Sequence, residues 1–155
     1  MDEEKEAKAD IQLDELRMDV KSEVRKTAKQ KDGIHELSAV VAVLEGSVDK
    51  AMSMDIESLK RAIYNRVDED VYYFLDDNLN VNIFENDEIK RKYITLRAIK
   101  DGIIAKSPNN RSMVWAKDKK VIATAPASID LTDHFVNFLS TDEGMLVLDE
   151  IMKRS

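Results

Sequence analysis

Apolar residues recur every three or four positions along stretches of this chain that contain almost no helix-breaking residues. The 155 residues include only four glycines and two prolines. An all-β fold needs many tight turns, and those turns depend largely on glycine and proline. An apolar residue at every third or fourth position instead covers one side of a helix. The chain is therefore predicted to consist mainly of two-faced helices.

The N-terminal third is predicted to form a helical hairpin. Apolar residues at helical spacing indicate a first helix within residues 1–31, and a second stripe indicates another helix over residues 34–52. Asp32-Gly33 lies between them, and a glycine enters the left-handed conformation of a helix C-terminus without steric cost. Gly46 is expected to weaken the second helix by about 1 kcal/mol. We expect residues 1–54 to be an amphipathic hairpin that acts as an association or docking element.

The second stripe is the predicted interface. Two helices leave one large apolar face uncovered, so that face needs a partner, either the rest of the chain or another subunit. The side chains assigned to this interface are Leu37, Val41, Leu44 and Val48.

Residues 55–155 are predicted to form an α+β domain. Ser53 or Asp55 can cap a helix that runs to about residue 67. Leu79, Val81 and Ile83 alternate with asparagines, which predicts a half-buried strand, and a helix follows to about residue 99. Three short apolar runs separated by turn residues predict an antiparallel meander at about residues 103–124, and a C-terminal helix pair completes the domain. The predicted fold class is helix-dominated α+β, with helices packed on a small sheet.

Charge is distributed unevenly along the chain, and its centre is basic. The formal net charge is −7, yet residues 89–125 carry ten Lys and Arg against two Asp and Glu. Such a segment attracts phosphate or an acidic protein surface, and the acidic flanks could equally neutralise it within the fold or between subunits.

Nucleic-acid binding is the alternative function that this basic segment supports. Cationic side chains bind phosphates and an exposed aromatic can stack on a base. The run from Leu96 to Ile104, followed by a hairpin that contains Val114-Trp115, resembles the recognition helix and wing of a winged-helix domain, and this resemblance implies a DNA-binding surface. The nucleic-acid candidates are Lys90, Arg91, Arg97, Arg111, Trp115, Lys117, Lys119 and Lys120.

The segment 76–87 resembles a degenerate EF-hand calcium loop. Oxygen ligands fall at its first, third, fifth and twelfth positions, but Val81 replaces the glycine of the sharp turn. The residues that would hold calcium are Asp76, Asn78, Asn80 and Asp87. The competing interpretation is a polar-faced strand whose apolar side meets the core.

The sequence does not favour an enzyme. It contains no cysteine, and its histidines, His35 and His134, lie in no recognisable catalytic or zinc-binding pattern. A metal-dependent hydrolase would have to gather a carboxylate cluster from Asp68, Asp70, Asp76 and Asp77. We expect no catalysis and no cofactor.

Together these patterns predict a cytoplasmic, non-catalytic protein that associates with itself or with another protein through amphipathic helices. The absence of cysteine fits a reducing compartment, and no stretch of the sequence is long and apolar enough for a bilayer span. Small charged accessory proteins of phages and bacterial assemblies have this character.

Overall fold

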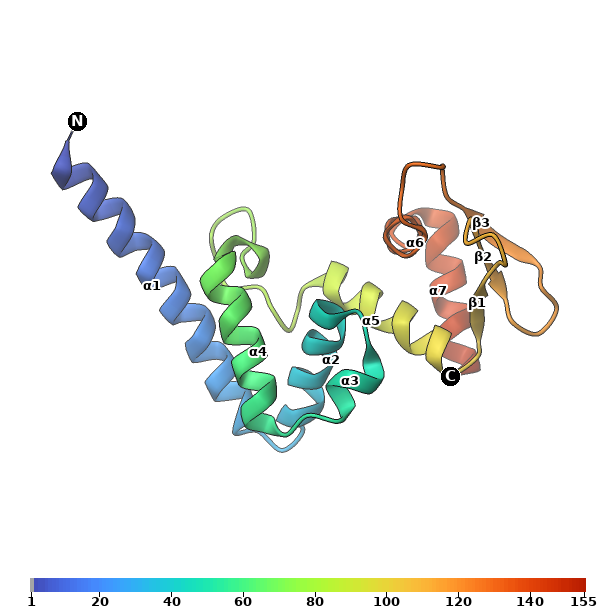
Figure 1. The fold of residues 1–155 in the computed structure, drawn as a ribbon, viewed down its shortest axis with the longest axis horizontal. Helices are drawn as coiled ribbons and strands as arrows, with labels where there is room; N and C mark the ends of the chain where they lie inside the picture. The colour runs from blue at the N-terminus through green and yellow to red at the C-terminus, as the bar shows by residue number, and fades with distance from the viewer. Residues whose placement is uncertain (1) are drawn as a thin grey trace. The chain divides into compact units, whose positions relative to one another are not determined.

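The computed structural model describes residues 2–155 and shows a helix-dominated α+β protein with one small sheet, as predicted (Figure 1). Its elements are α1 (Glu3–Ala28), α2 (Gly33–Glu45), α3 (Val48–Met52), α4 (Ile56–Glu69), the 3₁₀ turn η1 (Val71–Phe74), α5 (Asp87–Lys100), β1 (Ile104–Lys106), β2 (Ser112–Trp115), β3 (Val121–Thr124), α6 (Leu131–Phe138) and α7 (Asp142–Arg154). No helix formed by residues 2–155 has the length and apolarity to cross a bilayer.

The chain divides into two compact units. The first contains the residues up to 45 together with residues 49–86, and the second contains residues 46–48 and 87–155. The hairpin boundary predicted at residue 54 is therefore not a boundary between units. Helix α4 packs on both α1 and α2, because a two-helix hairpin leaves an apolar face that a third helix can bury.

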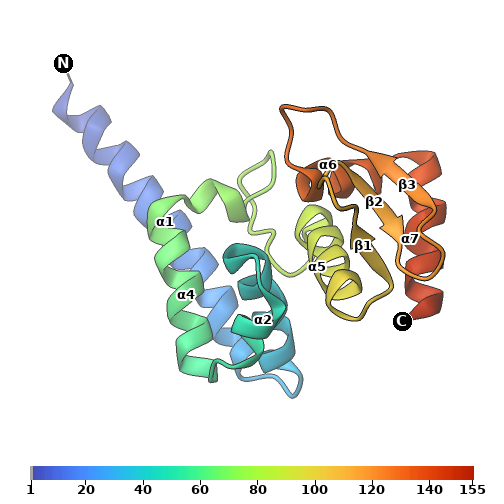
Figure 2. The same cartoon turned by 45° about the vertical axis from the view of Figure 1, so that its right-hand side comes forward.

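The first unit is a bundle of α1, α2 and α4, with η1 packed on α1 and α4 (Figures 1 and 2). Each helix contributes apolar residues at helical spacing to its interior. The fully buried side chains include Val20, Val24, Leu37, Val41, Leu59, Ile63 and Val67. Asp55 begins α4 by accepting a hydrogen bond from the Ser58 N–H at 2.8 Å, so one of the two predicted caps is correct.

Both glycines of the hairpin have roles that differ from those predicted. Gly33 begins α2 instead of ending α1, and a Cβ at this position would lie 2.1 Å from the Thr27 carbonyl oxygen. Gly46 has a φ of +68°, and it separates α2 from α3 instead of lying within one helix over residues 34–52. A residue with positive φ cannot continue a right-handed helix, so the predicted helix ends there.

The strand predicted at Leu79, Val81 and Ile83 does not form. Residues 76–80 form a tight loop in which the Asp76 N–H donates to the Asn80 carbonyl at 2.9 Å, and only a single bridge joins Leu75 to Val81. Leu79 has a φ of +63°, which is incompatible with extended strand backbone. The alternating residues of this segment belong to a loop, because the Asp76 carboxylate accepts hydrogen bonds from the N–H groups of Asn78 and Asn80.

The second unit places a three-stranded antiparallel meander against helices. The strand order is β1-β2-β3, with Ile104 opposite Trp115 and Met113 opposite Ala123. Helix α5 packs on β1, and α6 packs on α5, β2 and β3 (Figure 2). The core is formed by Ala98, Ile104, Met113, Ala125, Leu131, Phe135, Leu139 and Ile151. The predicted meander and C-terminal helix pair are both present.

Candidate interaction surfaces

Of the predicted interface residues, Leu37, Val41 and Leu44 lie on α2 and Val48 begins α3, and three of the four are buried. Leu37 and Val41 have no exposed area, Val48 is 5% exposed, and Leu44 is half-buried. Leu37 and Val41 are therefore core residues and not the external interface that was predicted. The physical reason is that α1 and α4 both pack on α2 and use the apolar face that the hairpin alone would leave open.

The N-terminal part of α1 is, by contrast, almost uncovered. All of residues 2–12 are exposed, and the first buried side chain of the helix is Val20. We call residues 2–18 the arm. Figure 1 shows the start of α1 running beyond α4, the helix against which its later turns pack. Asp2 caps the arm by accepting a hydrogen bond from the Glu4 N–H at 3.1 Å.

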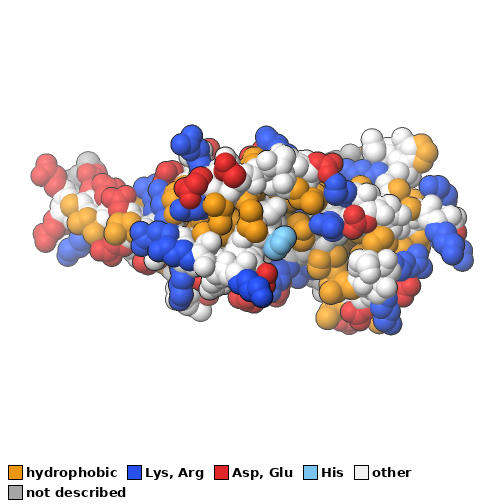
Figure 3. All heavy atoms as spheres, turned by 90° about the horizontal axis from the view of Figure 1, so that it is seen from below, with side chains coloured by type: hydrophobic (Ala, Val, Ile, Leu, Met, Phe, Trp, Pro, Cys, Tyr) orange, Lys and Arg blue, Asp and Glu red, His pale blue; other side chains and the backbone are white. Residues whose placement is uncertain are grey.

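Two apolar side chains stand out on the arm. Ile11 and Met18 are 56% and 64% exposed. Seven residues separate them, so they lie on the same side of the helix, whereas Val20 is nine residues after Ile11 and points to the opposite, core-facing side. Around them the arm carries seven acidic residues against three basic ones. Figure 3 shows this end of α1 with mainly acidic side chains at its tip and apolar side chains among them.

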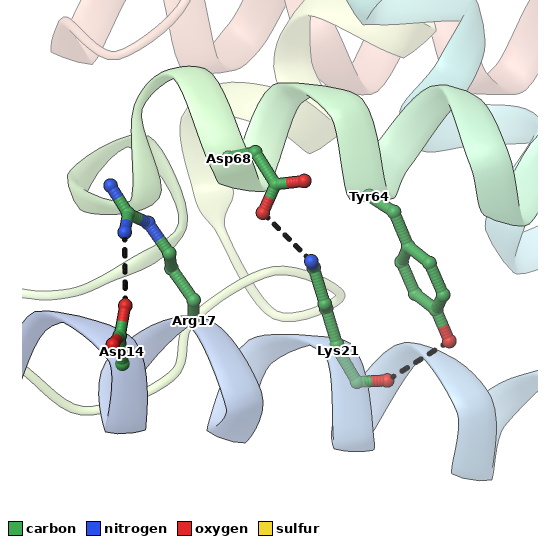
Figure 4. A network of polar contacts seen from close by, with 5 residues as sticks. All are labelled: Asp14, Arg17, Lys21, Tyr64 and Asp68. Carbon is green, nitrogen blue, oxygen red and sulfur yellow. Dashed lines mark hydrogen bonds and ion pairs between the residues drawn. The ribbon is translucent and has the colours of Figure 1, made fainter.

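A polar seam fixes the next part of α1 on α4 (Figure 4). The Lys21 Nζ donates to Asp68 Oδ1 at 2.7 Å and lies 5.6 Å from the centre of the Tyr64 ring. The Tyr64 hydroxyl donates to the Lys21 carbonyl at 3.4 Å, and Arg17 pairs with Asp14 at 3.2 Å. The contacts of the seam that join α1 to α4 are made at Lys21, after the exposed residues 2–12.

Three of the eight nucleic-acid candidates make contacts within the second unit. Arg97 donates to Asp101 at 3.1 Å, and hydrogen bonds to Asp101 and Tyr93 raise the pKa of its guanidinium. Arg111 donates through Nη2 to the Ala125 carbonyl at 3.0 Å. The guanidinium of Arg154 lies 4.0 Å from the centre of the Trp115 ring, which is half-buried. The three candidates Arg97, Arg111 and Trp115 therefore make contacts within the second unit.

The remaining cations are distributed over helix and turn. Lys90 is exposed and Arg91 half-buried on α5. Lys117, Lys119 and Lys120 are all exposed on the turn between β2 and β3. That turn is closed by two backbone hydrogen bonds, from Trp115 N–H to the Lys120 carbonyl at 3.0 Å and from Lys119 N–H to the Trp115 carbonyl at 2.9 Å. The turn therefore presents three lysines on a short, ordered segment.

The resemblance to a winged helix is weakened by this geometry. A winged-helix domain needs a strand and further helices before its wing. In the described residues the strand at 79–83 is absent and the sheet begins only after α5. Arg97, on the candidate recognition helix, is held by Asp101.

A groove lies on the face of the sheet between its two turns. Ala105, Val114 and Val121 form its floor; Ala105 is the register partner of Val114, and Val114 that of Val121. Val121 is 63% exposed. The remaining lining residues include the β1–β2 turn and two lysines, and they are Lys106, Ser107, Pro108, Asn109, Ser112 and Lys119. We call this the basic groove.

The candidate calcium residues are divided between the loop at residues 76–80 and the start of α5. The Asp76 carboxylate accepts hydrogen bonds from the N–H groups of Asn78 and Asn80, both at 2.9 Å. Asp87 is the first residue of α5 and belongs to the second unit. Across residues 2–155, no three His, Asp or Glu side chains are grouped in a way that could hold a metal. The four carboxylates considered for a hydrolase form no such group; they are Asp68, Asp70, Asp76 and Asp77.

The arm and the basic groove were not identified as sites from the sequence. The apolar stripe of the first helix begins only at Leu13, and this was a usable signal that the preceding turns lack a core-facing side. The groove had no such signal, since its floor and its lysines meet only when the three strands pair.

In comparisons with known proteins, no family model matches the chain, and no curated protein or solved structure is detectably similar to it.

Proposed function

We propose that this protein is a non-catalytic assembly protein that associates with further copies of itself through the exposed arm of α1. The proposal places it in a reducing compartment such as the cytoplasm, in keeping with a sequence that lacks cysteine. The proposed association uses a helix with exposed apolar residues, as predicted from the sequence, but that helix is α1 and not α2.

The observation that carries the proposal is the length of helix without packing. Residues 2–12 are exposed throughout, and isolated helices shorter than about 12 to 15 residues are only marginally stable in water. Ile11 and Met18 add apolar surface on the side that faces away from the core. A partner that covered each of them fully would gain roughly 1.5 to 3 kcal/mol per side chain. Association therefore supplies both an apolar contact and a support for the helix.

The test replaces the two exposed apolar residues of the arm. In sedimentation velocity, the unaltered protein is expected to show a mass that rises with concentration, and the Ile11→Glu, Met18→Glu double variant is expected to remain a monomer with an unchanged circular dichroism spectrum. Ile129→Glu is the matched control, because Ile129 is 48% exposed and lies outside the arm. Unaltered protein that stays monomeric at high concentration would refute the proposal.

A second candidate function, nucleic-acid binding, is favoured by one observation. Lys117, Lys119 and Lys120 are exposed together on one ordered turn, and lysines supply salt-dependent affinity for phosphates. The Lys117→Glu, Lys120→Glu variant is expected to lose a mobility shift with a DNA or RNA oligonucleotide, while Lys153→Glu, an exposed lysine of α7, retains it. A wild-type protein that gives no shift at low salt excludes this function.

A further inference from the structure

We propose that the arm of one copy docks in the basic groove of another, which makes the association head-to-tail. This inference rests on the self-association proposed above and names the two surfaces that meet. It follows from the shape and chemistry of the groove, from the charge of the arm, and from the position of the apolar residues on the arm.

The basic groove suits an apolar side chain flanked by acidic ones. Its floor consists of aliphatic side chains, with Val121 largely uncovered, and Lys106 and Lys119 are among its other lining residues. Lys117 and Lys120 are exposed beside it on the same turn. Within residues 2–155, these four lysines take part in no ion pair. Their charge is therefore available to a ligand.

The arm carries the complementary chemistry. On a helical projection, Glu4, Ile11, Glu15 and Met18 lie on one side of α1, because successive offsets of seven, four and three residues are each close to one or two whole turns. Apolar residues on that side can reach the groove floor while the carboxylates meet the lysines. Charge complementarity of this kind fixes the register and the partner as well as the affinity.

The composition of the groove favours a protein segment over nucleic acid. Its lining includes no aromatic side chain on which a base could stack, and Trp115, the protein's one tryptophan, is covered by Arg154. Nucleic acid would use the lysines and leave the apolar floor without a partner. An acidic amphipathic helix uses both.

Head-to-tail contact has a consequence for the size of the assembly. The two surfaces are different, so each copy that docks its arm still offers a groove, and each copy that is docked upon still offers an arm. Such heterologous contacts produce rings when the rotation closes and filaments when it does not.

The test reverses the charge of each surface separately. The arm variant is Glu4→Lys, Glu15→Lys and the groove variant is Lys106→Glu, Lys119→Glu; all four residues are exposed, and the control is Lys153→Glu. By sedimentation velocity, each charge-reversed variant is expected to lose association by roughly tenfold or more in dissociation constant. An equimolar mixture of the two is expected to restore it, since each reversed surface then meets its complement. The control is expected to associate as the unaltered protein does.

Three outcomes would overturn the inference. If the groove variant associates like the unaltered protein, the arm binds elsewhere, and the proposed function stands without this docking site. If no form of the protein associates, the proposed function fails with it. If the groove variant instead loses salt-sensitive binding to a fluorescent oligonucleotide while its self-association is unchanged, the groove is a nucleic-acid site.

Discussion

At the scale of the residue, three non-glycine residues among residues 2–155 adopt the left-handed backbone conformation, and all three lie in tight turns. Leu79, Asn110 and Lys119 have φ values of 63°, 57° and 63°. Asparagine tolerates this conformation, but leucine and lysine do so at a cost of about 1 to 2 kcal/mol. The turn between β2 and β3 uses this conformation at Lys119, which the structure places at the wall of the basic groove.

Leu79→Gly is expected to stabilise the protein. Leu79 is 40% exposed, and the relief of its left-handed backbone, about 1 to 2 kcal/mol, is expected to exceed the packing that the partly exposed side chain loses. The gain should be about 0.5 to 1 kcal/mol in the free energy of unfolding, measured by urea denaturation. Asn78→Gly is the matched control: its φ is not positive, so glycine there should bring no gain. A Leu79→Gly protein less stable than the control variant would contradict this account of the loop.

At the scale of the element, caps and close approaches determine where helices begin. Asp55, Asp130 and Thr141 each accept a hydrogen bond from a backbone N–H in the first turn of the helix that follows. Asp55 was one of the two caps predicted from the sequence. The close approach of α7 to the end of α6 was not predicted, because it depends on the angle between the two helices.

Gly144→Ala is expected to destabilise the second unit. A Cβ at Gly144 would lie 1.8 Å from the Phe138 carbonyl oxygen, so the two helix ends would have to separate. Overpacking against backbone costs roughly 1 to 3 kcal/mol. Denaturation followed by the fluorescence of Trp115, which lies in this unit, measures the loss. Met145→Ala, at an exposed neighbouring position, should be close to neutral, and equal stability of the two variants would show that the corner can relax.

Asp55 is expected to make the stability of the first unit depend on pH. The hydrogen bond from the Ser58 N–H lowers the pKa of this carboxyl below its ordinary value of 3.8. The folded state therefore favours the carboxylate, so its contribution is fully present above about pH 4 and is lost as the pH falls through the lowered pKa. Asp55→Asn retains a capping oxygen without a charge, so the slope of unfolding free energy against pH below 4 should be smaller than in the unaltered protein. Identical slopes would exclude a role for the charge.

At the scale of the whole molecule, the distribution of charge matters more than its sum. The net charge of −7 would make copies repel one another if it acted uniformly. The acidic arm and the lysines around the groove instead offer a route by which copies attract.

Salt therefore gives a test with a definite sign. Raising the ionic strength should weaken self-association, because salt screens attraction between the arm and the groove. Measurements of mass by light scattering at about 50 and 500 mM salt would show this, given Debye lengths that shorten from more than 10 Å to less than 8 Å. Association that strengthens with salt would indicate that repulsion between like-charged copies is the dominant electrostatic term.

The sequence by itself determined the local structure. Helical spacing, caps and turn residues located most helices, the three strands of the meander and the C-terminal helix pair, because these features depend on neighbours a few residues apart. The exceptions were Gly33, which begins α2 instead of ending α1, Gly46, which divides the helix predicted over residues 34–52, and residues 79–83, which lie in a loop region and not in a strand.

Only the tertiary structure decided which apolar face remains uncovered. Leu37 and Val41 belong to the most regular apolar stripe of the sequence and were expected at an external interface. They are instead buried, because α4 packs on α2, whereas Ile11 and Met18 at the start of α1 remain exposed. Burial is a property of pairs of elements that are distant in sequence, so periodicity identifies an apolar face but not what covers it. The basic groove has the same origin, because strand pairing brings Ala105, Val114 and Val121 together.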